Sequence, residues 1–125
     1  MGQPVVHFEV IGKDGEALQK FYGELFDWEF DTNNEQKYGL VDRDANLNEK
    51  GWGIAGGVAK GPDGYDGHVT FYVEVDDVAA TLDKVESLGG SKVFGPEEVF
   101  PGLVLGQFTD AEGHLIGLVM RAEQE

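Results

Sequence analysis

The chain has 125 residues, of which 41% are hydrophobic, so it is long and apolar enough for one ordinary folded domain. Nine lysines and arginines stand against 24 aspartates and glutamates, which gives a net charge of −15. Because this charge repels phosphates, we expect neither nucleic acid nor a membrane surface as a partner. The absence of cysteine excludes disulfides, thiolate nucleophiles and cysteine-ligated metals.

The first residues do not show the basic and apolar pattern of a signal peptide, and no apolar run approaches the ~18 residues of a membrane-spanning helix. We therefore expect a cytoplasmic protein. Any metal site would have to combine carboxylates with His7, His68 or His114, which are the three histidines of the chain.

Near the N-terminus, Val6, Phe8 and Val10 alternate with His7 and Glu9, which predicts a strand with one apolar and one polar face. We expect the apolar face to pack under the helix that follows.

Asp14 can cap this helix, which is predicted to begin near Gly15. Its apolar side chains fall on one stripe at helical spacing, namely Ala17, Leu18, Phe21, Tyr22, Leu25 and Phe26. Of these we expect Phe21, Tyr22 and Phe26 in the core, together with Trp28.

Three short strands are predicted next, around Trp28–Asp31, over Tyr38–Val41 and over Trp52–Val58, with a polar loop at Asp42–Lys50. The pair Gly56–Gly57 favours a bulge in the last of them, although glycine also permits a close backbone approach.

The segment Lys60–Gly67 is rich in glycine, proline and aspartate and reads as a linker, after which the pattern restarts. His68–Val75 alternates like the first strand, and Val69, Phe71 and Val73 should pack under a second helix. That helix is predicted to be capped by Asp76 or Asp77 and to stop at Gly89–Gly90. Strands should follow near Lys92–Phe94, at Leu103–Thr109 and at Leu115–Met120, with a turn at Phe100–Gly102.

The two halves match when they are shifted by 63 residues: Val6 meets Val69, Phe8 meets Phe71, Asp14 meets Asp77, Ala17 meets Ala80 and Leu25 meets Leu88. This repeat predicts an α+β fold of two tandem βαβββ modules, related by a pseudo-twofold axis and enclosing a concave cleft. We expect residues 1–125 to form one domain, with modules at 4–59 and 68–121 and a linker at 60–67. His7 and Glu9, which the shift pairs with Thr70 and Tyr72, should line the cleft.

The sequence resembles the vicinal oxygen chelate superfamily, which contains glyoxalases, bleomycin-resistance proteins and extradiol dioxygenases. The segments that carry the resemblance are VHFEV, FYGELFDWEF, VTFYVEVDDVAATLDKVESLGG and FTDAEGHLIGLVM. The last is similar to the closing signature of the family, with Ala111 in place of proline and His114 in place of asparagine. The resemblance implies the βαβββ fold but says little about activity, because this fold hosts many chemistries.

Enzymes of this family hold a divalent metal with His and Glu side chains on the first and last strands of each module. The resemblance places His7 at the first ligand position, but the second falls on Thr70 and the closing position on Gly117. The remaining strand offers no ligand, because Gly51–Pro62 contains no carboxylate. One ligand position of four is therefore filled, and no metal or other cofactor is expected. A rearranged site built from His7, Glu9 and His68 remains an alternative.

We expect the chain to bind a small organic molecule in the cleft, as the resemblance to drug-resistance proteins implies. The candidate contacts are His7, Glu9, Trp52, Thr70 and Tyr72, with no catalytic residue assigned. One alternative is a divergent enzyme, either a metal-dependent lyase, isomerase or dioxygenase, or a metal-free acid–base catalyst using His7 with Glu9. A second alternative is a passive structural or interaction domain. The relatives imply pairing as a homodimer.

Overall fold

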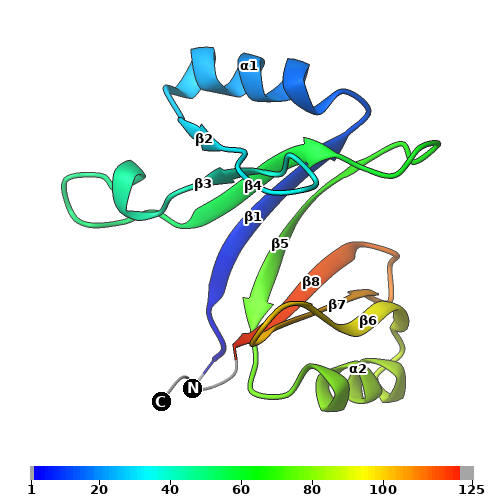
Figure 1. Cartoon of the computed structure of the whole chain (residues 1–125). Helices are drawn as coiled ribbons and strands as arrows, with labels where there is room; N and C mark the ends of the chain where they lie inside the picture. The colour runs from blue at the N-terminus through cyan, green and yellow to red at the C-terminus, as the bar shows by residue number, and fades with distance from the viewer. Residues whose placement is uncertain (1, 122–125) are drawn as a thin grey trace. The chain divides into compact units, whose positions relative to one another are not determined.

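The computed structural model describes residues 2–121, which form eight strands and two α-helices (Figure 1). The order strand, helix and three strands occurs twice, so the predicted βαβββ repeat is confirmed. The first set is β1 (Val5–Gly12), α1 (Gly15–Phe26), β2 (Phe30–Asp31), β3 (Gly39–Val41) and β4 (Ala55–Lys60), with a short 3-10 helix η1 (Asp44–Asn46) before β4. The second set is β5 (His68–Glu74), α2 (Val78–Ser87), β6 (Ser91–Phe100), β7 (Leu103–Thr109) and β8 (Leu115–Arg121).

The chain divides into two compact units. The first unit is His7–Val69, and the second unit comprises the residues up to Val6 together with those from Thr70 onward. Two strands are therefore divided between the units, since Val5 and Val6 of β1 belong to the second unit and His68 and Val69 of β5 belong to the first. Within the second unit, the Glu74 amide donates to the carbonyl of Pro4, just before β1, at 2.9 Å.

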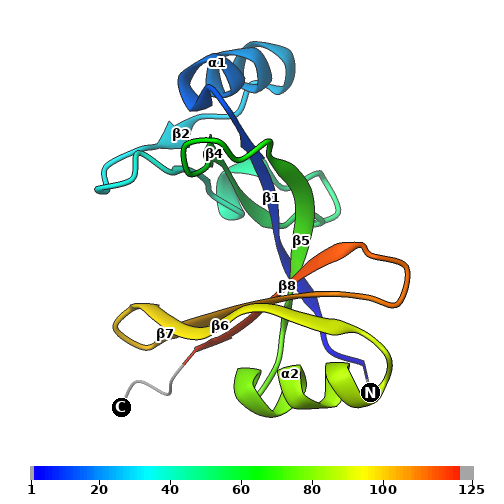
Figure 2. The same cartoon turned by 90° about the vertical axis from the view of Figure 1, so that its right-hand side faces the viewer.

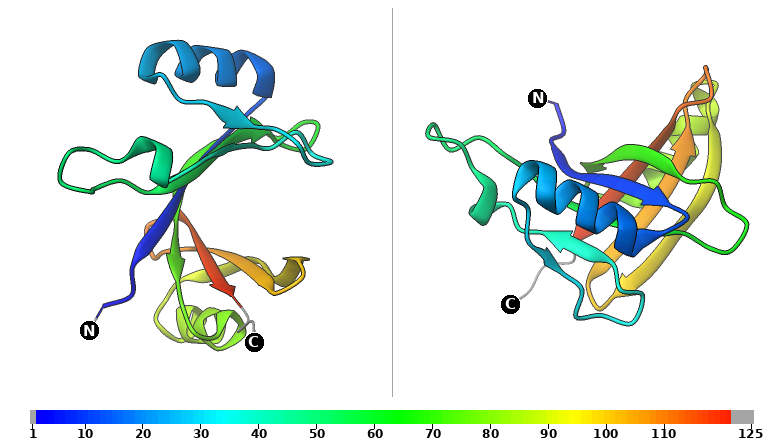
Figure 3. Two further views of the ribbon diagram at one scale, coloured as in Figure 1. Left: turned by 60° about the vertical axis from the view of Figure 1, so that its left-hand side comes forward. Right: turned by 90° about the horizontal axis from the view of Figure 1, so that it is seen from above.

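In the first unit the strands lie in the order β2-β3-β4-β1, with β1 parallel to β4 and the other pairs antiparallel. Helix α1 lies over one face of this sheet (Figure 3). The Asp14 carboxylate caps it, as predicted, by accepting from the Ala17 amide at 3.0 Å. The helix meets the sheet through small and polar residues, because Gly15 packs against the backbone of β4 and Gln19 donates to the Val58 carbonyl at 2.8 Å.

The prediction that Phe21 and Phe26 of α1 lie in the core is wrong, because these side chains are 57% and 52% exposed. Leu25, on the same stripe, is 57% exposed. Since the helix approaches β4 through Gly15 and Gln19, the stripe is turned partly away from the sheet. Only its edge is covered: Tyr22 and Phe26 pack with Trp28, and Trp28 packs with Phe8.

In the second unit the strands lie in the order β5-β8-β7-β6, with β5 parallel to β8. Helix α2 lies against this sheet (Figure 2), and Asp77 caps it through the Ala80 amide, as one of the two predicted caps. The core is a cluster of Val75, Val78, Leu82 and Leu118, surrounded by half-buried apolar side chains. The surrounding side chains are Val73, Val104, Phe108 and Met120.

Two expectations about the second unit are wrong. Phe71 is 39% exposed, so it is not buried under α2 as predicted; Val69, which belongs to the first unit, is 76% exposed. Ten residues of helix span only ~15 Å, and α2 covers β5 from Val73 onward. Strand β6 is also longer than the predicted segment, because it continues through Gly95 and Pro96 by way of bulges in its pairing with β7.

Among residues 2–121 no helix combines the length and the apolar character needed to cross a bilayer.

Candidate functional site

His7 and Glu9 lie on the sheet face of the first unit opposite α1, because they alternate with Phe8 on β1. Phe8 points to the helix side, where its ring centroid lies 5.1 Å from that of Trp28. The predicted division of β1 into an apolar and a polar face is therefore correct for these three residues. The polar face carries the imidazole of His7 and the carboxylate of Glu9, which can bind a ligand or transfer a proton.

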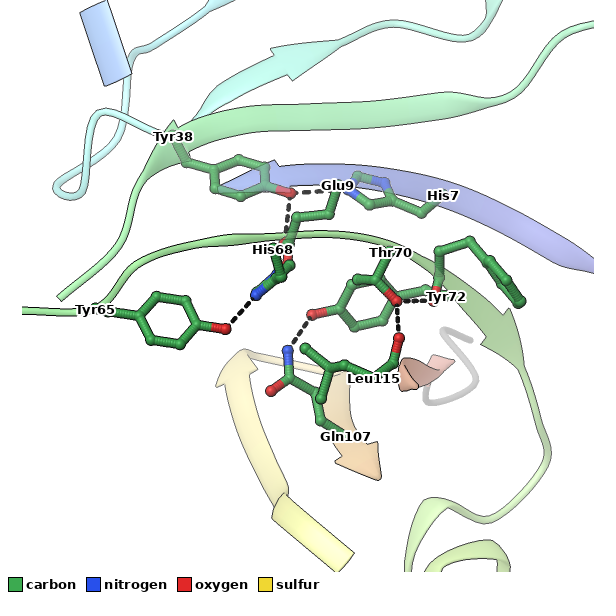
Figure 4. Close-up of polar contacts among 10 residues, drawn as sticks. His7, Glu9, Tyr38, Tyr65, His68, Thr70, Tyr72, Gln107 and Leu115 are labelled. Atoms are coloured by element: carbon green, nitrogen blue, oxygen red, sulfur yellow. Dashed lines mark hydrogen bonds and ion pairs between the residues drawn. The ribbon is translucent and has the colours of Figure 1, made fainter. Parts of the chain in front are cut away.

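Five polar side chains of the first unit form a continuous hydrogen-bonded chain (Figure 4). His7 Nε2 lies 3.0 Å from the Tyr38 hydroxyl, which donates to Glu9 Oε1 at 2.9 Å. Glu9 Oε2 lies 2.7 Å from His68 Nε2, and His68 Nδ1 lies 2.5 Å from the Tyr65 hydroxyl. We call this chain, His7–Tyr38–Glu9–His68–Tyr65, the polar network.

The directions of these hydrogen bonds are fixed by Glu9, since a carboxylate can only accept. The Tyr38 hydroxyl and His68 Nε2 must both donate to it. Because the hydroxyl hydrogen of Tyr38 is directed at Glu9, the Tyr38 oxygen accepts a hydrogen bond from His7 Nε2. The hydrogen bonds from His7 and Tyr38 on one side, and from His68 on the other, therefore all point toward Glu9. The side chains of Glu9 and His68 are only 10% and 13% exposed, which strengthens these charge-assisted contacts.

Tyr38 reaches Glu9 because its ring lies across the strand β4. Gly57 is the β4 partner of Glu9, and a Cβ at Gly57 would come within 2.0 Å of the Tyr38 ring. The Asn34 side chain holds the tyrosine backbone from both sides, accepting from its amide at 2.8 Å and donating to its carbonyl at 2.9 Å.

The bulge expected at Gly56–Gly57 is absent, since β4 pairs with β1 and β3 in unbroken register. The two glycines instead leave space for two rings on opposite faces of the strand. Gly57 lies beneath Tyr38, and Gly56 lies beneath Phe8, whose ring a Cβ would meet at 2.1 Å.

The two predicted site residues of the second unit differ in what their hydroxyls do. Thr70 is 7% exposed, and its hydroxyl donates to the Leu115 carbonyl at 2.5 Å, which ties β5 to β8. Tyr72 is 5% exposed, and its hydroxyl accepts from Gln107 Nε2 at 3.0 Å (Figure 4). The Tyr72 ring lies over Gly117, where a Cβ would come within 2.4 Å of it.

Trp52, the remaining predicted contact, lies in the loop between η1 and β4 and is 70% exposed. Its backbone is held by Asn48, whose side chain accepts from the Trp52 amide at 3.0 Å and whose own amide donates to the Trp52 carbonyl at 2.9 Å. Trp52 thus presents its indole at the surface of an ordered loop and takes no part in the polar network.

The side chains at the four family ligand positions do not fit a divalent metal. His7 is hydrogen-bonded to Tyr38, and the hydroxyl of Thr70 is engaged by a backbone carbonyl. The closing position is Gly117, which pairs with Tyr72, and β4 carries no carboxylate, with Gly57 as the partner of Glu9; both glycines lie under tyrosine rings. Within residues 2–121, no three acidic or histidine side chains gather closely enough to ligate one ion.

Sequence reasoning missed Tyr38, Tyr65 and Gln107. The sequence predicts a strand at Tyr38 and a linker at Tyr65, and neither segment has a periodicity that reveals the direction of a side chain. A glycine opposite a polar strand residue was the available signal, because a missing side chain leaves space for a ring from elsewhere. The residues of the alternative metal site, His7, Glu9 and His68, are links of one hydrogen-bonded chain that runs through Tyr38, and within residues 2–121 they do not form a group that could hold an ion.

Comparison with known proteins agrees with this architecture. Residues 5–118 match the model of the Glyoxalase/Bleomycin resistance protein/Dioxygenase superfamily. Curated proteins named "Putative glyoxylase CFP32", from Mycobacterium bovis and Mycobacterium tuberculosis, are each 32% identical over 106 residues. That alignment covers 84% of this chain but 41% of theirs, so the chain spans about two fifths of the length of these relatives.

Among solved structures, Streptomyces coelicolor methylmalonyl-CoA epimerase in complex with 2-nitronate-propionyl-CoA superposes with a TM-score of 0.65 at 17% identity, covering 98% of this chain and 97% of that one. A superfamily member from Vibrio splendidus gives a TM-score of 0.61 at 16% identity, covering 95% and 99% of the two chains. At these identities the likeness concerns the fold alone. The family model, which spans nearly the whole sequence, shows that the chain belongs to the Glyoxalase/Bleomycin resistance protein/Dioxygenase superfamily.

Proposed function

We propose that this chain binds a small organic molecule at the polar network of its first unit, and that it does so without a tightly held divalent metal. The observation that carries the proposal is the engagement of Tyr38, whose ring covers Gly57 of β4 and whose hydroxyl is hydrogen-bonded to His7, the one filled ligand position. The network offers imidazole, phenol and carboxylate groups to a ligand, which suits recognition by hydrogen bonds.

Burial supports this assignment. A sheet face that served only as core would carry apolar side chains, whereas Glu9 and His68 are nearly buried and are joined by a 2.7 Å contact between Oε2 and Nε2. Buried polar networks of this kind cost desolvation energy, and proteins tend to retain them where they serve a site. The family name and the curated relatives support small-molecule chemistry of the glyoxalase or bleomycin-resistance type.

The test begins with metal analysis of protein purified without a histidine tag, followed by thermal-shift scans with nickel, zinc, manganese and ferrous iron. We expect substoichiometric metal and no saturable stabilisation by any of the four ions. Stoichiometric metal, or stabilisation lost in His7→Ala but kept in His114→Ala, would overturn the metal-free proposal. His114 is the matched control because it lies in an exposed turn.

Ligand binding is tested with a panel of small aromatic and polar compounds that includes bleomycin. We expect at least one compound to raise the melting temperature saturably, and the effect to be lost in His7→Ala and in Tyr38→Phe. If no compound of any class binds, the passive interaction domain becomes the better description.

The continuity of the polar network favours a second candidate, proton transfer without a metal. A proton that His7 takes up at Nδ1 can pass from its Nε2 through the Tyr38 hydroxyl to the Glu9 carboxylate, where the hydrogen bonds converge, and can return by the same route. A bound compound with an acidic C–H should then exchange that hydrogen in D2O, and the exchange should stop in Glu9→Gln. Binding without exchange would leave the protein as a binder only.

A further inference from the structure

The polar network reaches the Glu9 carboxylate by two arms, each with one tyrosine and one histidine in opposite order (Figure 4). Glu9 Oε1 accepts from the Tyr38 hydroxyl, behind which lies His7. Glu9 Oε2 accepts from His68 Nε2, behind which lies Tyr65. The first arm therefore ends in an imidazole and the second in a phenol, and all five residues belong to the first unit.

The direction of the outer hydrogen bond in the second arm follows from the chemistry of imidazole. His68 donates through Nε2 to the Glu9 carboxylate, which can only accept. In a neutral imidazole the other nitrogen then carries a lone pair, so the Tyr65 hydroxyl donates to His68 Nδ1 across 2.5 Å. The two rings meet at 70° with their centroids 5.6 Å apart, which suits a contact through the hydroxyl rather than through stacked faces.

We propose that Tyr65 is a positioning residue of the polar network. Its hydroxyl holds His68 with Nδ1 unprotonated and Nε2 protonated, and His68 in turn holds the carboxylate of Glu9. This inference rests on the proposed function, because it concerns the same site, and it gives the two arms different tasks. The imidazole of His7 can take up a proton, whereas a phenol keeps its own at neutral pH. The Tyr65 arm therefore anchors the carboxylate and leaves proton uptake to the other arm.

The loop at 61–67, between β4 and β5, holds Tyr65 in place for this task. The Gly61 amide donates to the Gly12 carbonyl at 3.0 Å, which ties the loop to the end of β1. The Tyr65 amide donates to the Pro62 carbonyl at 3.0 Å and closes a turn. The Tyr65 ring lies over Gly61, where a Cβ would come within 2.8 Å of it. Within the predicted linker, a hydrogen-bonded turn thus carries Tyr65 to His68.

The charged groups of this loop are poor candidates for the same task. Its ion pairs, Lys13–Asp66 and Lys60–Asp63, are exposed, and exposed ion pairs contribute little to order. The His68 side chain, by contrast, is only 13% exposed. Without the Tyr65 hydroxyl, a lone pair on this nearly buried imidazole loses its donor, which disfavours the orientation that directs Nε2 at the carboxylate.

The experiment follows the imidazole nitrogens of His68 in the 15N-labelled full chain by long-range 1H–15N correlation spectra at neutral pH, with no ligand added. The His68 signals are assigned by their loss in His68→Gln. We expect an unprotonated Nδ1 and a protonated Nε2 in the parent protein. In Tyr65→Phe the Nδ1 resonance should move, and the Nε2 proton should exchange with solvent at least about threefold faster, as the loss of one hydrogen bond predicts. Tyr22→Phe is the matched control and should change neither signal, because Tyr22 acts through its ring.

Two results would overturn the inference. A proton on His68 Nδ1 in the parent protein would mean that Tyr65 accepts instead of donating, and this spectrum needs no variant of Tyr65. His68 signals that stay the same in Tyr65→Phe, even with a lower melting temperature, would make the hydroxyl a structural contact only.

These readouts are taken on the protein alone, so they are separate from the test of the proposed function. A compound panel without any binder, together with the expected His68 signals, would remove the small-molecule function and keep Tyr65 as the residue that positions His68. A compound that binds, together with unchanged His68 signals in Tyr65→Phe, would keep the function and remove Tyr65 from the site.

Discussion

The ring of Tyr38 lies directly over Gly57, at a spacing that excludes any side chain at that position. A Cβ there would come within 2.0 Å of the ring, and the same tyrosine joins His7 to Glu9 through its hydroxyl. The glycine is therefore a condition for the polar network. An alanine at position 57 has to push the ring aside, and the hydroxyl leaves Glu9 with it.

We expect Gly57→Ala to destabilise the fold by about 1–3 kcal/mol, the usual cost of overpacking an ordered site. Urea denaturation measures this loss. The double variant Gly57→Ala/Tyr38→Ala should lose less than the sum of the single losses, because the clash disappears with the ring. Gly2→Ala is the control, since a Cβ at Gly2 meets nothing within 4 Å. Additive losses in the double variant would show that the ring does not occupy this place.

Tyr38→Phe tests the hydroxyl without removing the ring. The variant takes one donor from the Glu9 carboxylate and one acceptor from His7, so we expect a loss of about 1–2 kcal/mol in the free energy of unfolding. Tyr22→Phe is the matched control, because Tyr22 acts through its ring in the aromatic cluster with Phe26 and Trp28. Equal small effects in both variants would contradict the network.

The alternation of β1 was enough to predict that His7 and Glu9 share a face opposite Phe8, and the repeat was enough to predict both helices with their caps. These features depend on local periodicity and on capping chemistry, which the sequence carries directly. The register of β4, and with it the role of Gly57, depends on which strand lies beside which. That information comes from pairings distant in the sequence.

The side chains that complete the polar network and the hydrogen bond to Tyr72 were beyond such reasoning. Tyr38 and Tyr65 reach the network from irregular segments, and Gln107 became significant only through its pairing with Gly117 and the contact with Tyr72. The prediction that all the aromatic side chains of the α1 stripe lie in the core was wrong for a related reason. The spacing of the stripe correctly predicts a helix but cannot tell which side meets the sheet, and Gly15 and Gln19 turned out to do so.

The Glu9–His68 contact should be among the more strongly coupled pairs of the first unit. Both side chains are nearly buried and lie 2.7 Å apart, so His68→Ala leaves a poorly solvated carboxylate. We expect a loss of about 2–3 kcal/mol for this variant. Glu9→Gln in the same background should restore part of it, giving a coupling energy of about 1 kcal/mol or more in a double-mutant cycle. A coupling energy near zero would mean that the two groups are not in contact in solution. The control is His114→Ala, in an exposed turn, which should lower the free energy of unfolding by less than about 0.5 kcal/mol.

The turn before β8 should give the fold a dependence on acid pH. The backbone amide of His114 donates to the Asp110 carboxylate and is the main reason that the pKa of this carboxyl lies below its usual range. The His114 imidazole and the Glu112 amide act in the same direction, while burial opposes them. Because the folded pKa is lower than the unfolded value of about 3.9, the stabilisation is fully present above that pH and is lost as the pH falls through the folded pKa.

We therefore expect Asp110→Ala to lower the melting temperature at pH 5, and the gap to the parent protein to narrow as the pH is lowered from 5 to 3. Melting curves at half-unit intervals measure this change. Asp110→Asn keeps an oxygen that can accept from the His114 amide but does not titrate, so below pH 4 its melting temperature should converge with that of the parent protein. A gap between Asp110→Ala and the parent that stays constant down to pH 3 would show that the Asp110 carboxylate does not stabilise this turn.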